Sequence, residues 1–274
     1  MKTLLKPLFD AVLYRWNKFN LKKQQQQIAG LTWFSIKKLK HDKSDHLKVH
    51  RSKIGDLYYT QAQQLYHGLQ EVLVDEIYKV NLASNARIID CGANIGLSVL
   101  YFKSICPSAH ITAFEPDRHN FELLTKNCIV NNLKQVDLVE AAVWKENTQL
   151  KFIAQGGMDS KISEGAEEGI LVKAYSLIDY LQDPVDFLKL DIEGAEFEVL
   201  KNIEEYMDKI AFNDEATDNN KTDLEAKLSS QLRKLPQQNL LIVTASDRKS
   251  PTKQMGVSLN KTLAAAPDAE QIQT

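Results

Sequence analysis

Long apolar runs and paired cysteines are both missing from this 274-residue sequence. No stretch of about 18 consecutive apolar residues occurs, so no transmembrane helix can be read from it. The first residues also lack the long apolar centre and small-residue cleavage site of a secretory signal. The three cysteines, Cys91, Cys106 and Cys128, form no CxxC pair, which argues against a disulfide framework and against a zinc site. These absences predict a cytoplasmic protein.

Aromatic residues are absent from the C-terminal part of the chain. All 22 of them (3 Trp, 9 Tyr and 10 Phe) lie at or before Phe212, and from Asp247 onward the chain is polar and weakly patterned. The overall composition, 43% apolar and 26% charged, is typical of a globular protein. We therefore predict a basic N-terminal extension over residues 1–57, a folded domain over residues 58–246 and a polar, flexible tail over residues 247–274.

Acidic residues are scarce near the N-terminus. Residues 1–53 contain 13 Lys and Arg against 3 Asp and Glu, whereas the whole chain has a net charge of −2. Within residues 1–21, apolar residues recur at near-helical spacing, which predicts an amphipathic helix. Two interpretations stay open: the helix packs on the acidic body, or it makes peripheral contact with a membrane surface. The tract "QQQQ" at residues 24–27 is predicted to be a linker.

The central part of the chain alternates between short apolar strands and helices. This alternation predicts an α/β fold with a doubly wound, Rossmann-like parallel sheet and helices on both faces. The stretch "TWFSIKKLK" is predicted to be a strand, and residues 60–80 a helix. Further strands are predicted over residues 86–92, 110–116, 136–144, 185–193 and 239–246, and further helices over residues 95–105, 117–131 and 195–207.

The segment "IIDCGANIG" at residues 88–96 has the pattern of a nucleotide-binding loop. Asp90 ends the predicted strand, and Gly92 and Gly96 allow the tight turn and close backbone approach that such a loop needs. The middle glycine of the GxGxxG dinucleotide pattern is missing, which disfavours a pyrophosphate. Glu115 ends the next strand, where a carboxylate accepts both hydroxyls of a ribose. A nucleotide without phosphates, S-adenosylmethionine, fits this combination better than NAD.

Four motifs in order extend this prediction: "IIDCGANIGLSVLYF", "ITAFEPD", "VEAAVW" and "DFLKLDIEGAEFEVLKNI". Together they resemble the FkbM family of S-adenosylmethionine-dependent methyltransferases, from about Tyr58 to about Ile210. The resemblance implies the doubly wound methyltransferase fold and O-methylation of a saccharide, glycan or natural-product acceptor. It also implies a set of cofactor contacts: Asp90, Gly92, Asn94, Gly96 and Glu115, with Ala142 near the adenine.

The stretch "KLDIEGAE" contains the candidate catalytic residues. A hydroxyl acceptor must lose its proton as it attacks, so the site needs a base near the cofactor edge. Asp191 and Glu193 are the candidates for that base. Alternatively, these acids hold a divalent metal that lowers the hydroxyl pKa. Glu196, in the first turn of the following helix, is more simply a structural residue that caps the helix.

The resemblance fades after about residue 211, where "DKIAFNDEATDNNKTD" replaces the apolar strand usual in the family. A second hypothesis is therefore a catalytically degenerate protein that binds the cofactor or a partner. The basic N-terminus suggests a third, a nucleic-acid methyltransferase, but no Asn/Asp-Pro-Pro-aromatic signature for attack by a base amine is present. We therefore expect a small-molecule or saccharide acceptor and no nucleic acid; the oligomeric state is left open.

Overall fold

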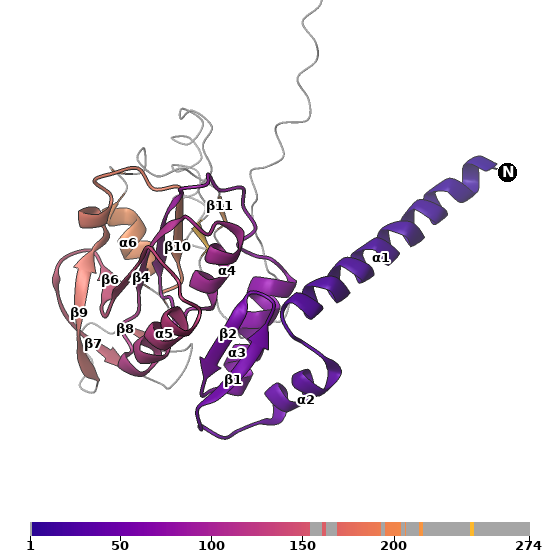
Figure 1. The fold of residues 1–274 in the computed structure, drawn as a ribbon. Coiled ribbons are helices and arrows are strands. Elements are labelled where there is room, and N and C mark those ends of the chain that lie inside the picture. Colours follow the sequence, from indigo (N-terminus) through magenta and orange to yellow (C-terminus); the bar gives the residue numbers. More distant parts are fainter. Residues whose placement is uncertain are drawn as a thin grey trace, which may run out of the picture.

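The computed structural model describes residues 2–153, 161–162, 169–192, 195–203, 206, 214–215 and 242–243. A four-stranded parallel sheet lies at its centre (Figure 1). Its strands, in spatial order, are β10 (Phe187–Leu190), β3 (Arg87–Cys91), β4 (His110–Phe114) and β5 (Val136–Val139). The chain passes from β3 to the neighbouring β4 and then to β5, and β10, the last of the four in sequence, lies on the other side of β3. The predicted doubly wound α/β fold is confirmed by this strand order.

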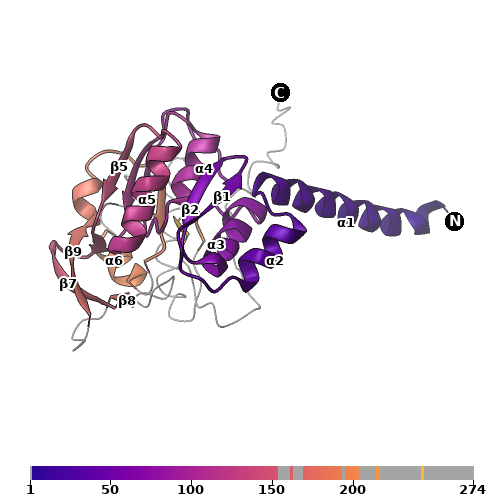
Figure 2. The ribbon, with the colours of Figure 1, turned by 60° about the horizontal axis from the view of Figure 1, so that its bottom comes forward.

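Helices cover both faces of the parallel sheet because neighbouring side chains on each strand point to opposite faces. On β10, Phe187 belongs to the core that also contains residues of α4 (Leu97–Ile105) and α5 (Arg118–Val130). The next residue, Leu188, belongs to the opposite core, with residues of α6 (Glu196–Asn202) and of the 3₁₀ helix η2 (Leu177–Tyr180). Figure 2 shows α4 and α5 side by side over the sheet. As predicted, Asp117 caps α5, where its Oδ1 accepts from the backbone N–H of Asn120 at 2.9 Å.

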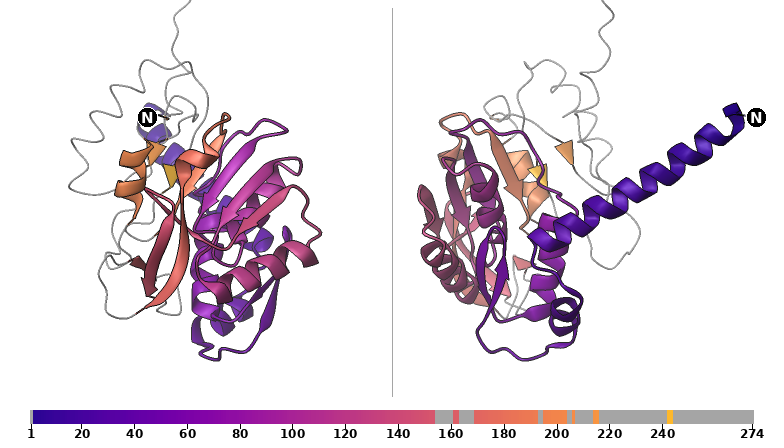
Figure 3. Two further views of the ribbon diagram at one scale, coloured as in Figure 1. Left: turned by 90° about the vertical axis from the view of Figure 1, so that its left-hand side faces the viewer. Right: turned by 45° about the vertical axis from the view of Figure 1, so that its right-hand side comes forward.

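A second four-stranded sheet lies beside the first (Figure 3). Its order is β6 (Ala142–Trp144), β9 (Ile170–Ser176), β7 (Thr148–Ile153) and β8 (Lys161–Ile162). The prediction of one strand over residues 136–144 is therefore wrong, because β5 and β6 belong to different sheets. The chain turns between them, where the N–H of Ala141 donates to the carbonyl of Val139 at 2.9 Å.

Two N-terminal predictions are also corrected. Helix α1 (Lys2–Ile28) continues through the glutamine tract, which is therefore not a linker. The stretch predicted as a strand is the helix α2 (Trp33–His41). Thr32 and Ser35 form a capping box at its start, and such a box satisfies amide donors that a strand would have to pair with a neighbour.

A hairpin that the sequence analysis did not identify follows α2. Its strands are β1 (Lys48–Ser52) and β2 (Gly55–Tyr59), paired antiparallel. Buried Leu31, Leu39 and Leu57 share one hydrophobic core with the sheet residue Ile88. Residues 29–57 therefore pack as part of the body, and the predicted boundary after residue 57 falls inside β2.

The helix predicted over residues 60–80 is shorter and changes type along its length. It comprises α3 (Ala62–Leu69) and then one turn of π-helix, η1 (Gln70–Val74). At the other end of the chain, β12 (Ile242–Val243) lies within the predicted strand 239–246 and pairs parallel with β11 (Asp214–Glu215). Glu193 and the predicted tail over residues 247–274 lie outside the described residues. No helix in the described part of the chain has the length and apolarity to cross a bilayer.

Candidate active site

The turn after β3 is held by the protein's own backbone. Gly92 has φ +82°, and a Cβ there would lie 1.9 Å from the carbonyl oxygen of Asp191. Gly96 has φ +89°, and its Cβ would lie 2.7 Å from Leu124 Cδ1 on α5. Asn94, with φ +50°, takes the same left-handed conformation between them. These glycines therefore permit close packing against β10 and α5, a reason for glycine that the sequence analysis did not foresee.

A buried ion pair joins the neighbouring strands β3 and β10 of the parallel sheet. Lys189 Nζ lies 2.9 Å from Asp90 Oδ1, and both side chains are almost fully buried. Lys189 also donates to the carbonyl of Gly92 at 2.7 Å, and Ser98 Oγ donates to Asp90 Oδ2. Burial alone would lower the pKa of Lys189, but the charges of Asp90 and Asp191 and the nearby Tyr78 raise it. Lys189 is therefore a cation that fixes the loop, and Asp90 faces it rather than the loop amides.

Glu115 supports the same loop from the end of β4. Its Oε2 accepts from the N–H of Asn94 at 2.8 Å, and its Oε1 accepts from the N–H of Asp117 at 2.9 Å. The residue is 5% exposed. Burial raises the pKa of Glu115 from 4.5 to about 7, even though the two amide hydrogen bonds lower it. Its carboxyl group therefore titrates near neutral pH.

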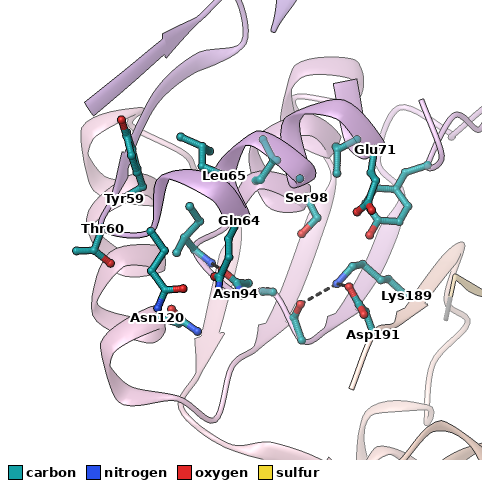
Figure 4. Close-up of a pocket in the computed structure, with 18 residues that line it drawn as sticks. Tyr59, Thr60, Gln64, Leu65, Glu71, Asn94, Ser98, Asn120, Lys189 and Asp191 are labelled. Carbon is teal, nitrogen blue, oxygen red and sulfur yellow. Dashed lines mark hydrogen bonds and ion pairs between the residues drawn. The ribbon is translucent and has the colours of Figure 1, made fainter. Parts of the chain in front are cut away.

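A pocket opens beside this loop (Figure 4). One wall is the loop itself, the start of α4 and the end of β10, with Asn94, Ser98, Lys189 and Asp191. The opposite wall comes from the end of β2 and from α3 and η1, which the sequence analysis did not connect with the site. The residues of that wall that Figure 4 labels are Tyr59, Thr60, Gln64, Leu65 and Glu71. The π-helical turn η1 could have indicated this wall, because π-turns often accompany functional sites. It has no clear sequence signature, however, so it becomes visible only in the structure.

The pocket gathers part of the predicted site. Gly92, Asn94 and Asp191 line it, and Asp191 Oδ2 lies 3.6 Å from Lys189 Nζ. Gly96 and Glu115 are not among the residues that line it.

The other predicted site residues are elsewhere. Ala142 begins β6 of the second sheet, is 2% exposed and packs in a small core with Ala195. Its contact with an adenine stays a prediction, and the candidate base Glu193 lies outside the described residues. Glu196 Oε1 accepts from the N–H of Ile192 at 3.2 Å, so it holds the chain before α6 and does not form the predicted cap, since the N-cap Ala195 has no side-chain cap hydrogen bond. The described residues contain no group of three or more His, Cys, Asp or Glu side chains placed to hold a metal ion.

Known proteins resemble the chain over this same region. The methyltransferase FkbM domain matches residues 90–223. Methyltransferase sdnD of Sordaria araneosa is 31% identical over 184 residues, which cover 53% of this chain and 70% of that protein. The chain belongs to the FkbM methyltransferase family. Methyltransferase 1 of Beauveria bassiana is a second relative, 26% identical over 50% of this FkbM chain and 66% of its own length.

Two further similarities to this FkbM methyltransferase are more limited. The AMB antimetabolite synthetase AmbE of Pseudomonas aeruginosa is 39% identical over 67 residues, which are 3% of that protein. The crystal structure of methyltransferase FkbM from Methylobacillus flagellatus KT aligns with a TM-score of 0.36 at 17% identity, covering 65% of this chain and 47% of that one. The fold assignment therefore depends on the strand order of this chain itself.

The boundaries of the family match divide the pocket of this FkbM methyltransferase. The match begins at Asp90, so it includes the glycine loop, Lys189 and Asp191. The wall formed by β2, α3 and η1 precedes it in the chain. The pocket therefore combines a wall from the shared domain with a wall from the N-terminal segment of this chain.

Proposed function

We propose that this FkbM methyltransferase uses S-adenosylmethionine to methylate a hydroxyl oxygen on a saccharide, glycan or natural-product acceptor. The observation that supports this most is the placement of Asp90, Glu115 and Asp191. Asp90 is the penultimate residue of β3, and Glu115 and Asp191 directly follow the neighbouring strands β4 and β10, so all three lie at the carboxyl edge where ligands of open α/β sheets bind. When bound, the cofactor would supply a methyl group already activated by its positive sulfonium.

The residues present fit such a cofactor. Each carboxylate oxygen of Glu115 accepts one amide hydrogen bond and has a second lone pair for a ribose hydroxyl. In the pocket, Glu71 and Asp191 contribute two carboxylates. The single ammonium of Lys189 is already neutralised by Asp90 behind it. The wall is therefore net negative, which suits a cationic ligand.

Asp191 is the described residue best placed to accept the proton of the acceptor hydroxyl. Its side chain is 20% exposed and lines the pocket, next to the turn at Gly92. Glu193 remains an alternative base. The wall of β2, α3 and η1 would then select the acceptor, because it faces the loop from outside the shared domain. One relative is an antimetabolite synthetase, which favours a small natural product as the acceptor.

Calorimetric titration of S-adenosylmethionine and S-adenosylhomocysteine tests the cofactor. We expect the wild type to bind both ligands. Glu115→Ala should lose roughly 1–3 kcal/mol of binding free energy, since the buried ribose hydroxyls would lose their acceptor. Glu122→Ala, which removes an exposed glutamate, is the matched control. Thermal unfolding of each variant separates lost binding from lost folding. A well-folded wild type that binds neither ligand would overturn the proposal.

The protons released on binding give a second measurement in the same titration. Hydroxyl groups that donate to Glu115 stabilise its ionised form. Ligand binding should therefore release protons near pH 7, and the affinity should increase as the pH rises from 6 to 8. The measured enthalpy should therefore depend on the ionisation enthalpy of the buffer in the wild type, and much less in Glu115→Gln.

Methyl transfer to a panel of saccharides, small hydroxylated natural products and RNA tests the acceptor. Once an acceptor is found, Asp191→Asn should keep cofactor binding and lose about 100-fold or more in turnover, as expected for a general base. Transfer to RNA alone would favour a nucleic-acid methyltransferase. Cofactor binding without transfer to any of the panel would favour the degenerate alternative.

A further inference from the structure

Helix α1 extends away from the body and touches it only near its C-terminal end (Figures 1 and 3). Beyond that contact, five large apolar side chains are exposed by 43–67%. They are Leu13, Tyr14, Trp16, Phe19 and Leu21. Leu13, Trp16 and Phe19 are spaced by three residues and therefore follow one side of the helix. The expectation that this helix packs on the acidic body is not met along residues 13–19; the contact is limited to the C-terminal part of α1, where Lys22 Nζ lies 3.6 Å from Asp75 Oδ1.

Basic side chains lie next to these apolar ones. Arg15 and Lys18 follow a neighbouring stripe of the helix and are exposed, whereas Lys22, one turn further on, pairs with Asp75 of the body. In sequence, α1 contains six Lys and Arg and one acid, Asp10. Over the full length of α1 the apolar residues do not gather on one face. The part that resembles helices lying in the interface of a membrane is the stripe of Leu13, Trp16 and Phe19 beside Arg15 and Lys18.

The direction of α1 is fixed by a well-formed end. Leu31 N–H donates to the carbonyl of Gln26 at 2.8 Å, and Gly30 N–H donates to Gln27 at 3.2 Å, the Schellman pattern. Buried His50 Nε2 lies 2.7 Å from the carbonyl oxygen of Ala29. The exposed side chains are therefore presented by a helix anchored to the folded body.

A second exposed aromatic pair lies on the next helix. Trp33 and Phe34 begin α2 and are 67% and 77% exposed. Lys37 lies 5.5 Å above the Trp33 ring. Helix α2 packs on α3, and α1 contacts η1, so both helices adjoin the N-terminal wall of the pocket.

We infer that α1 and the start of α2 form a docking surface for an anionic lipid membrane. The surface comprises Leu13, Arg15, Trp16, Lys18 and Phe19 of α1, with Trp33 and Phe34 of α2. Its positive charge is complementary to anionic headgroups, and its indole and phenyl rings suit the boundary between headgroups and acyl chains. Pairing of two α1 helices would bring like charges together, which opposes self-association. The exposed Leu13 and Leu21 contribute nothing to phosphate recognition, which disfavours a nucleic acid.

Vesicle flotation of the full chain tests the apolar part of this surface. We expect binding to vesicles of phosphatidylserine and phosphatidylcholine, and much weaker binding to phosphatidylcholine alone. Trp16→Ala/Phe19→Ala should lose most of that binding. Ile129→Ala/Leu171→Ala is the matched control, since it removes two side chains of the body that are 71% and 63% exposed. Tryptophan emission should shift to the blue on binding, a signal from Trp16 and Trp33 because Trp144 is buried.

Charge variants test the electrostatic part. Each basic residue near an anionic surface changes partitioning by roughly five-fold, so Arg15→Gln/Lys18→Gln should bind roughly 25-fold more weakly. Lys134→Gln/Lys173→Gln, exposed on the body, is the control and should bind as the wild type does. Binding should also weaken as salt rises.

Four outcomes would overturn the inference. These are no binding to anionic vesicles at low salt, binding unchanged in both surface variants, dimerisation through Trp16 and Phe19 without vesicle binding, and binding of RNA without vesicle binding. Cofactor titration is independent of all four, so a failure here leaves the methyltransferase proposal intact.

Discussion

Asp90 and Lys189 show how a single pair of residues shapes the site. Both charges are removed from water, and each is compensated by the other and by a neutral partner, Ser98 or the Gly92 carbonyl. Such a pair is costly to break, because one charge is then left buried alone. The same two residues also hold the turn against β10. The pair therefore links the stability of the sheet to the shape of the pocket.

Lys189→Met should destabilise the protein by about 3–5 kcal/mol, because it leaves the Asp90 carboxylate buried without its cation. Urea denaturation followed by circular dichroism measures this. The double variant Asp90→Asn/Lys189→Met should recover part of the loss. A cost below about 1 kcal/mol for Lys189→Met would mean that the pair is not buried as described.

Glu115 should make stability depend on pH in an unusual direction. Its folded pKa of about 7 lies above the reference of 4.5, so the folded state binds more protons between these values. Its contribution is fully present below pH 4.5 and is lost as pH rises through 7. Between pH 4.5 and pH 8, wild type should lose about 3 kcal/mol more than Glu115→Gln in urea titrations. Glu122→Gln, at an exposed site, should behave as the wild type, and parallel curves for all three proteins would contradict the prediction.

At the scale of elements, helix α5 serves as a pairing partner for strand β2. The Asn127 side chain accepts from the N–H of Tyr58 at 2.7 Å and donates to its carbonyl at 3.0 Å. Asn131, one turn later, makes the same two contacts with Asp56 at 2.9 Å and 2.7 Å. Two side-chain amides thus satisfy backbone groups that a neighbouring strand would otherwise pair. This arrangement attaches the N-terminal hairpin, and with it one pocket wall, to the sheet domain.

Asn127→Ala should destabilise the protein more than an alanine substitution on a helix usually does. Asn127 is 2% exposed and also donates to the carbonyl of Ile95 in the glycine loop at 2.8 Å. Its removal leaves backbone groups of Tyr58 and Ile95 without that partner, which should lower the free energy of unfolding by about 3 kcal/mol. Chemical denaturation is the measurement, with Asn17→Ala on exposed α1 as the control. Equal stability of the two variants would show that the hairpin is not held in this way.

In the whole molecule, one parallel sheet separates two hydrophobic cores. Phe187 and Leu188 are adjacent on β10 and fully buried, yet they belong to different cores. The ion pair of Lys189, two residues on, connects the same strand to β3. The cores are therefore coupled through the sheet, and we expect them to unfold together.

Phe187→Ala and Leu188→Ala should each lower the unfolding free energy, by about 3–5 and 2–5 kcal/mol respectively, through lost burial and a new cavity. Each variant should still show one transition, with circular dichroism and Trp144 emission changing together. Two separated transitions in either variant would show that the cores are independent.

Several elements could be predicted from local pattern because their signals lie within a few residues. Strand β3, helix α4, strand β4 and the Asp117 cap of α5 all lie where apolar spacing and cap chemistry predict them. The candidate site was predicted in the same way, as a loop after one strand and acids after others. Parallel strands end at one edge, so Gly92, Asn94 and Asp191 were expected to meet and do line one pocket.

Only the tertiary structure decided which distant surfaces pair. It split residues 136–144 between two sheets, because Ala142 pairs with Ala174 in β9 rather than with β4. It also brought the wall of β2, α3 and η1 against the glycine loop and left α1 exposed. The sequence by itself determined backbone conformations and caps, which depend on neighbours along the chain. Partner choice depends instead on which apolar faces and unpaired backbone groups remain after the local elements form, a property of the whole chain.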